Sequence, residues 1–89
     1  MQPVVETGID EKVLRASDQF CKALGYTLDE LVGKKLSSLV KDDPLAQKNF
    51  LTSWQSAKGV EPQHPTEFIF SSKNGRDVWL IGSFILSGV

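Results

Sequence analysis

Cysteine is almost absent from this chain, which has one, Cys21, among 89 residues. A single cysteine allows no internal disulfide and no cysteine-based zinc site. Long apolar runs are also missing, since none approaches the roughly 18 residues that a membrane-spanning helix needs. The N-terminus lacks the charged-then-apolar pattern of a signal peptide. We therefore expect a soluble, cytoplasmic domain with no direct membrane contact.

Neither sign of charge is in excess, because 10 Lys and Arg residues face 11 Asp and Glu residues and the net charge is -1. Nucleic acids and anionic membranes are bound through basic patches. The densest basic stretch here is only Lys34-Lys35, so we expect no nucleic-acid partner. The length, residues 1–89, indicates one small domain with room for one core and one small-molecule cavity.

Catalytic constellations are missing as well. General acid–base chemistry needs a positioned pair of titratable groups, and nothing places the sole histidine, His64, near a second candidate. The pair Asp42-Asp43 stands before Pro44, where acidic residues cap a helix. No phosphate-binding loop, catalytic triad or nucleophile elbow is found. The sequence therefore indicates that the chain is not an enzyme.

The most informative run present is Phe20–Leu36, which reads FCKALGYTLDELVGKKL. It predicts two short helical pieces. Thr27 and Glu30 have the spacing of a capping box at the start of the second piece. Gly25 and Gly33 fall where a left-handed C-terminal cap is wanted. These start and stop signals together predict two short helices joined by a tight turn.

Regular elements are also predicted on both sides of this run. Residues 3–7 and 12–16 are expected to form two short strands, after which Ser17 or Asp18 caps the first helix. A longer helix is expected to begin at Asp42-Asp43-Pro44 and to end near Lys58. Its apolar stripe is predicted to comprise Phe50, Leu51, Trp54 and Ala57. Residues 59–65 are expected to form an irregular polar loop.

A hairpin is predicted around Asn74-Gly75, because this dipeptide favours a two-residue type I′ turn. The turn would pair Phe70 with Trp79 and Phe68 with Ile81, so these four side chains would share the inner face. The opposite face would then carry Val78, Leu80, Phe84 and Leu86. The fold class expected is α+β, an antiparallel sheet with short helices and one longer helix packed on one face.

This order of elements, together with two motifs, resembles a PAS domain over about residues 4–87. The run FCKALGYTLDELVGKKL is similar to the family's aromatic, Gly-Tyr, acidic turn and Gly-Lys pattern, and KNGRDVW is similar to its Lys-Asp-Gly turn. Trp54, shortly before Gly59, is similar to a feature of PAS modules in bacterial chemotaxis and aerotaxis receptors. Many PAS domains have asparagine where this chain has Ser17, which caps a helix about as well.

The resemblance also implies a five-stranded sheet in the order 2-1-5-4-3, of which the sequence up to Val89 supplies four strands. The fifth would lie between the first and the fourth. Either the chain is a fragment of a larger signalling protein, or another chain or a rearranged strand fills that place. We expect a homodimer through the sheet, because open strand edges and exposed apolar faces favour association.

The resemblance implies that a ligand would be held between the inner face of the sheet and the longer helix. The alternative is that the same side chains simply fill the core, because small interiors leave few voids. The residues expected to line such a cavity are Leu36, Leu39, Leu51, Trp54, Phe68, Phe70, Trp79 and Ile81.

The cofactor is not identified by the sequence. Haem needs an axial ligand, usually histidine. The sole histidine, His64, lies in the expected loop, and Lys35-Leu36-Ser37 stands where aerotaxis-type relatives carry a histidine. Both observations argue against haem. The Asn-Cys-Arg-Phe motif of photochemical flavin binding is missing, and Cys21 is expected to behave as a small hydrophobe. Non-covalent flavin remains open because Trp54 and Trp79 could stack on its ring.

The resemblance implies a sensory module that binds a small ligand or cofactor and relays its state to a flanking output domain. The alternative is a ligand-free interaction module that dimerises through the outer face of the sheet.

Overall fold

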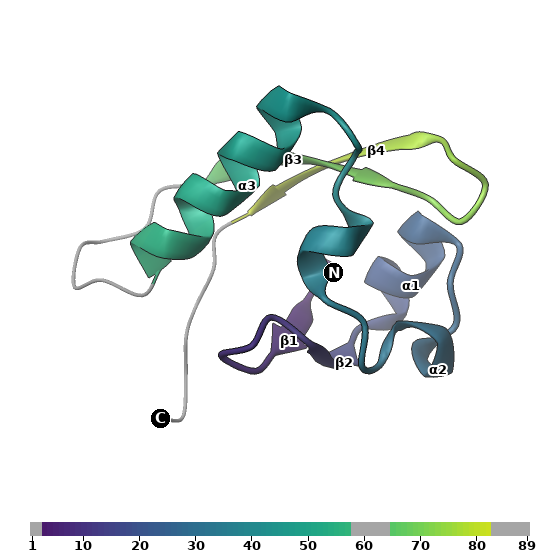
Figure 1. The fold of residues 1–89 in the computed structure, drawn as a ribbon. Helices are drawn as coiled ribbons and strands as arrows, with labels where there is room; N and C mark the ends of the chain where they lie inside the picture. The colour runs from purple at the N-terminus through teal and green to yellow at the C-terminus, as the bar shows by residue number, and fades with distance from the viewer. Residues whose placement is uncertain (1–2, 58–64, 83–89) are drawn as a thin grey trace.

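The computed structural model describes residues 3–57 and 65–82 (Figure 1). Along the described residues a pair of antiparallel strands is followed by helical segments and then by a second antiparallel pair, which confirms the α+β class. The elements in chain order are β1 (Val5–Thr7), β2 (Val13–Ala16), α1 (Asp18–Leu24), α2 (Leu28–Leu31), the 3-10 helix η1 (Leu36–Leu39), α3 (Pro44–Ala57), β3 (Thr66–Ser71) and β4 (Asp77–Gly82).

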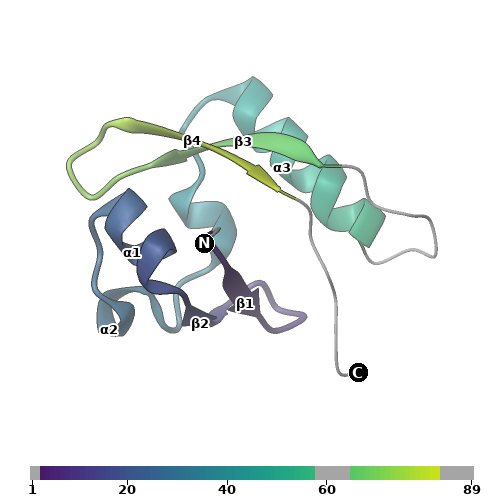
Figure 2. The ribbon, with the colours of Figure 1, turned by 180° about the vertical axis from the view of Figure 1, so that it is seen from behind.

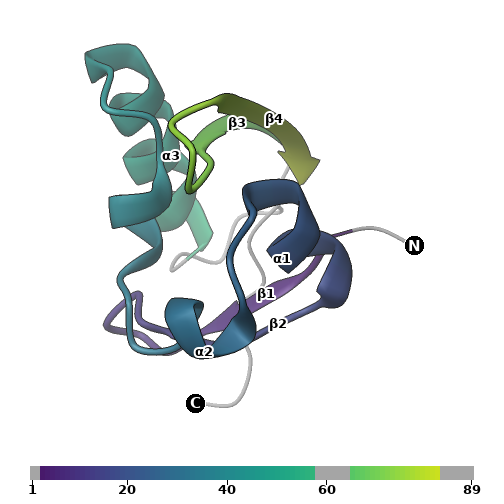
Figure 3. The same cartoon turned by 90° about the vertical axis from the view of Figure 1, so that its right-hand side faces the viewer.

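The strands form two separate antiparallel ladders, β1 with β2 and β3 with β4. The β3–β4 hairpin lies along one side of the molecule and the β1–β2 pair along the opposite side, as Figures 2 and 3 show from two further directions. Within residues 3–57 and 65–82, no ladder joins β1 to β4. The core between these layers comprises Val13, Phe20, Leu24, Leu31, Leu36, Leu39, Val40, Ala46, Phe50, Trp54, Phe68 and Phe70.

The short helices begin and end where their capping residues predict. Ser17 Oγ accepts a hydrogen bond from the backbone N–H of Phe20 at 3.3 Å, which caps α1. Thr27 and Glu30 form the reciprocal capping box of α2. Gly25 and Gly33 have φ angles of 78° and 88°, in the left-handed region that favours glycine. Local signals therefore determine this part of the fold.

Helix α3 is fixed at its N-terminus by two side chains. Asp43 Oδ2 accepts from the backbone N–H of Ala46 at 3.0 Å, and Gln47 Nε2 donates to the carbonyl of Lys41 at 3.2 Å. The buried residues of α3 recur at every fourth position, namely Ala46, Phe50 and Trp54.

The predicted stripe of α3 was therefore wrong at Leu51, which is 50% exposed. One residue turns a side chain about 100° around a helix, and Phe50 already faces the core. The predicted helix end at Lys58 lies outside the described residues. The same holds for nearly all of the predicted loop, and for Phe84 and Leu86.

The hairpin turn contains three residues rather than the two that were predicted. The N–H of Ser72 donates to the carbonyl of Arg76 at 2.8 Å, and the N–H of Gly75 donates to the carbonyl of Ser72 at 2.9 Å. Gly75 has a φ of 83°, as expected, but Asn74 does not share the positive φ that a type I′ turn requires. A three-residue loop with its last residue in the left-handed region fits this pattern.

The extra loop residue shifts the register by one, so the predicted pairs were wrong. Phe68 is opposite Leu80, and Phe70 is opposite Val78. Because side chains alternate along a strand, a shift of one residue moves a whole set of side chains to the other face. Trp79 and Ile81 therefore lie on the outer face of the hairpin, while Val78 and Leu80 pack against the core.

Candidate functional site

The interior between α3 and the inner face of the hairpin contains a continuous series of aromatic rings. Trp54 stacks on Phe50 with ring centroids 6.5 Å apart, and Phe50 meets Phe68 edge to face at 6.4 Å. Phe68 contacts Phe70 at 6.3 Å, and Phe70 meets Phe20 of α1 edge to face at 5.8 Å. These contacts connect the long helix, the hairpin and the first helix through side chains alone.

The eight residues predicted to line a cavity divide into two groups. Three of them face solvent: Leu51, Trp79 and Ile81 are 50%, 57% and 73% exposed. Leu51 lies on the solvent side of α3, and the hairpin register turns the other two outward. The five that the structure brings together in the interior are Leu36, Leu39, Trp54, Phe68 and Phe70.

This arrangement corrects the prediction that two tryptophans could stack on one flavin ring. Trp54 belongs to the buried core, whereas Trp79 lies on the outer face of the hairpin, with β3 and β4 between them. The two indoles cannot enclose the same planar ligand. His64, the one histidine, lies outside the described residues, and Cys21 is half-buried against the core.

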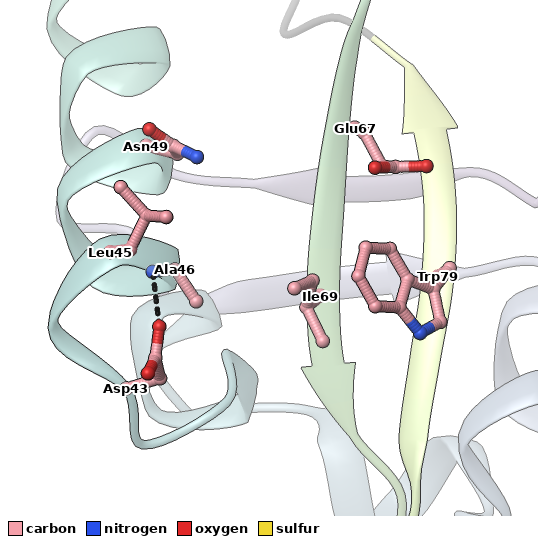
Figure 4. A pocket seen from close by; sticks show the side chains of 7 residues that line it. All are labelled: Asp43, Leu45, Ala46, Asn49, Glu67, Ile69 and Trp79. Atoms are coloured by element: carbon pink, nitrogen blue, oxygen red, sulfur yellow. Dashed lines mark hydrogen bonds between the residues drawn. The ribbon is translucent and has the colours of Figure 1, made fainter.

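A second feature, missed by the sequence analysis, is a groove of about 200 Å³ between α3 and the outer face of the hairpin (Figure 4). The side chains of Ala46 and Asn49 of α3 point toward β3, and the Trp79 indole of β4 lies beside Ile69. One wall of the groove includes Leu45 and Asn49, four positions apart on α3, and the other includes Glu67 and Ile69, two positions apart on β3. The lining residues are Asp43, Leu45, Ala46, Asn49, Glu67, Ile69 and Trp79.

Ion pairs and backbone hydrogen bonds join the hairpin to the rest of the fold, among them a bond from the N–H of Lys41 to the carbonyl of Ile69 at 2.8 Å. The N–H of Lys73 donates to the carbonyl of Leu24 at 2.8 Å, and its ammonium pairs with the Glu30 carboxylate. Lys41 Nζ lies 2.9 Å from Asp77 Oδ2 at the start of β4. Hydrogen bonds from the Lys73 ammonium and from the Thr27 backbone lower the pKa of Glu30 from 4.5 to about 2. The Asp77 carboxylate raises the pKa of Lys41.

In the parts of the chain that the structure describes, no group of three His, Cys, Asp or Glu side chains is arranged to hold a metal ion. Within the same residues, no helix is both long and apolar enough to cross a membrane.

Comparison with known proteins identifies the fold. The chain matches the sequence profile described as PAS domain over residues 2–87. Its structure is similar to that of the PAS domain of an HTR-like protein from Haloarcula marismortui, with a TM-score of 0.67 and 17% sequence identity. The match covers 86% of this chain and 65% of that chain, so this chain spans slightly less than two thirds of that structure. A search of curated proteins finds no match.

The chain therefore belongs to the PAS domain family. Members of this family are in general sensory and signalling modules rather than enzymes.

Proposed function

We propose that this PAS domain binds a small, largely apolar ligand between α3 and the inner face of the β3–β4 hairpin. The observation that supports this proposal is the convergence of Leu36, Leu39, Trp54, Phe68 and Phe70, which come from three separate elements and are all buried. Ligand sites in proteins are mostly apolar and are found where layers of structure meet.

The same packing indicates how the ligand's presence would be relayed. Aromatic rings fill the interior closely, so a ligand enters only if α3 or the hairpin moves. The hairpin is attached to α1 and α2 through the Lys73 contacts with Leu24 and Glu30. Its displacement would strain those contacts and change the surfaces available to a flanking output domain, as expected of a module from a bacterial chemotaxis receptor or sensor kinase.

The test begins with the chain purified from bacteria. Visible absorption bands would indicate a bound flavin or haem, and native mass spectrometry would detect a colourless ligand. A Leu39→Phe variant adds volume inside the proposed site, and Leu51→Phe makes the same change on the exposed side of α3. Loss of the bound mass in the first variant but not in the second supports the site. Equal retention in both folded variants contradicts it.

A second candidate function is a ligand-free interaction module, including a homodimer formed through the sheet. Its support is the outer face of the hairpin, where Trp79 and Ile81 are exposed. The open edges of β1 and β4, which pair within the described residues only with β2 and β3, add a second route to association. Sedimentation velocity at micromolar concentration tests it. A monomer at every concentration contradicts the homodimer and leaves interaction with other proteins to be tested separately.

A further inference from the structure

The groove on the outer side of the hairpin has large, exposed apolar side chains on both of its walls. Leu45 is 65% exposed at one wall and Trp79 is 57% exposed at the other, with Ile69 between them. Exposed apolar patches with polar rims are typical of interaction sites. The volume of about 200 Å³ is below the roughly 300–1,000 Å³ of pockets that hold drug-sized ligands. The groove therefore suits side chains of a partner rather than a cofactor.

The charges of the groove have one sign. Among the described residues that line it, the charged ones are Asp43 and Glu67, and none is a lysine or an arginine. Lys41, two residues before Asp43, is already paired with Asp77. Asp43 uses one carboxylate oxygen to cap α3. A partner that offers a cation would therefore meet two carboxylates beside an exposed indole.

This distribution disfavours a second copy of the chain as the occupant. A two-fold dimer places the same patch against itself. Groove against groove would bring together Asp43 and Glu67 of both copies, and the described lining offers no basic residue to place between them. Like charges brought face to face across an interface cost free energy. Charge complementarity instead selects a basic partner.

We propose that the groove binds a segment of a partner protein that carries arginine beside large apolar side chains. The guanidinium lies between Asp43 and Glu67, its aliphatic stem lies against Trp79, and the neighbouring apolar residues cover Ile69 and Leu45. A guanidinium over an indole gains cation–π attraction, and its planar shape suits carboxylates. This inference rests on the second candidate function, the interaction module, and specifies its partner.

The test uses the full 89-residue chain, labelled with ¹⁵N, and a synthetic amphipathic peptide of leucine and arginine. A matched peptide has citrulline, which is uncharged and nearly isosteric, in place of arginine. The Trp79 indole N–H resonance, identified with Trp79→Phe, reports binding together with the amides of residues 43–49 and 67–69. The arginine peptide is expected to shift these resonances and to bind about three- to tenfold more tightly than the citrulline peptide, as two exposed ion pairs allow.

Two double variants separate the groove from general electrostatics. Asp43→Asn with Glu67→Gln removes both groove charges, and asparagine preserves the helix cap. Asp42→Asn with Glu6→Gln removes two charges from residues that do not line the groove. The first pair is expected to abolish the preference for arginine over citrulline, and the second to retain it.

Several results would overturn the proposal: equal binding of the two peptides, equal losses in the two double variants, shifts confined to another face, or no binding at millimolar peptide. A homodimer that buries Trp79 before any peptide is added would also overturn it while leaving the interaction module intact. Failure of the ligand-sensor function is measured separately by absorption and native mass spectrometry, which do not depend on the groove charges.

Discussion

Trp79 lies directly opposite Ile69 in the β3–β4 ladder, on the face that points away from Phe68 and Phe70. This pairing separates the two tryptophans of the chain into different environments. Trp54 is buried in the aromatic interior at 2% exposure, and Trp79 is open to solvent. The register of one hairpin thus determines which indole belongs to the core and which belongs to the outer groove.

Fluorescence of single-tryptophan variants should show this difference. Trp54→Phe leaves Trp79, which is expected to emit at longer wavelength and to be quenched readily by acrylamide. Trp79→Phe leaves the buried Trp54, which is expected to emit at shorter wavelength and to resist the quencher. The reverse behaviour would contradict the observed register and support the one predicted from the Asn74-Gly75 turn.

Truncation of Trp54 should be among the costly substitutions in this fold. Trp54→Ala is expected to reduce the free energy of unfolding by roughly 3–5 kcal/mol, because it leaves a cavity beside Phe50. Leu51→Ala, three positions away on the exposed side of α3, is the control and should change stability much less. Urea denaturation of both variants measures the difference. Similar losses in the two would mean that the helix faces the core differently.

The turn glycine should be sensitive to any side chain. A Cβ at Gly75 would meet no atom within 4 Å, so the cost of Gly75→Ala comes from the φ of 83° alone. We expect a loss of roughly 1–2 kcal/mol from this left-handed conformation. Gly82→Ala also places its Cβ in open space but without a positive φ, and it should be nearly neutral. Thermal unfolding of the two variants provides the comparison, and equal midpoints would contradict the assigned turn.

Acid should weaken the contact between Lys73 and Glu30. The pKa of Glu30 falls from 4.5 to about 2 on folding, so this carboxylate contributes stability above pH 4.5 and loses that contribution as the pH approaches 2. Glu30→Gln keeps a residue type that completes a capping box but removes the charge.

The difference in melting temperature between the wild type and Glu30→Gln should therefore be present at pH 6 and disappear near pH 2. A difference that stays constant over this range would show that the ion pair does not carry it. Glu6→Gln is a suitable control, since the Glu6 carboxylate lies 3.9 Å from Arg15 in a highly exposed pair.

The helical part of the fold could be predicted from sequence because its determinants are local. The Ser17 cap and the Thr27–Glu30 capping box need only neighbouring backbone groups. The hairpin register could not be predicted in the same way. Ser72 Oγ accepts from the N–H of Arg76 at 3.0 Å, and Lys73 is bonded to Leu24, about fifty residues earlier in the chain. The first bond lies within the turn itself, whereas the second is a tertiary contact, and the Asn-Gly propensity did not outweigh the two together.

The residues of the interior could be predicted in part, where their positions depend only on the local periodicity of the sequence. Phe68 and Phe70 lie two positions apart on β3, and both are buried, as predicted. Side chains two positions apart on a strand share a face whatever the partner strand is, so this prediction did not depend on the hairpin register. Leu51 was misplaced because several helical stripes fit the α3 sequence, and only the packing on β3 selects one. The outer groove depends on both the helix orientation and the hairpin register, so neither pattern alone indicates it.

The number of residues that join β3 to β4 helps to decide which alternate side chains of β4 reach the interior. If β3 stays in place and the turn keeps its three-residue loop, deletion of one residue would bring Trp79 and Ile81 inward and turn Val78 and Leu80 outward. Single-residue insertions or deletions at this turn are therefore not neutral surface variation, because they exchange the composition of the core and the groove at once. A change of two residues would preserve both, so even and odd length changes among relatives should have opposite structural effects.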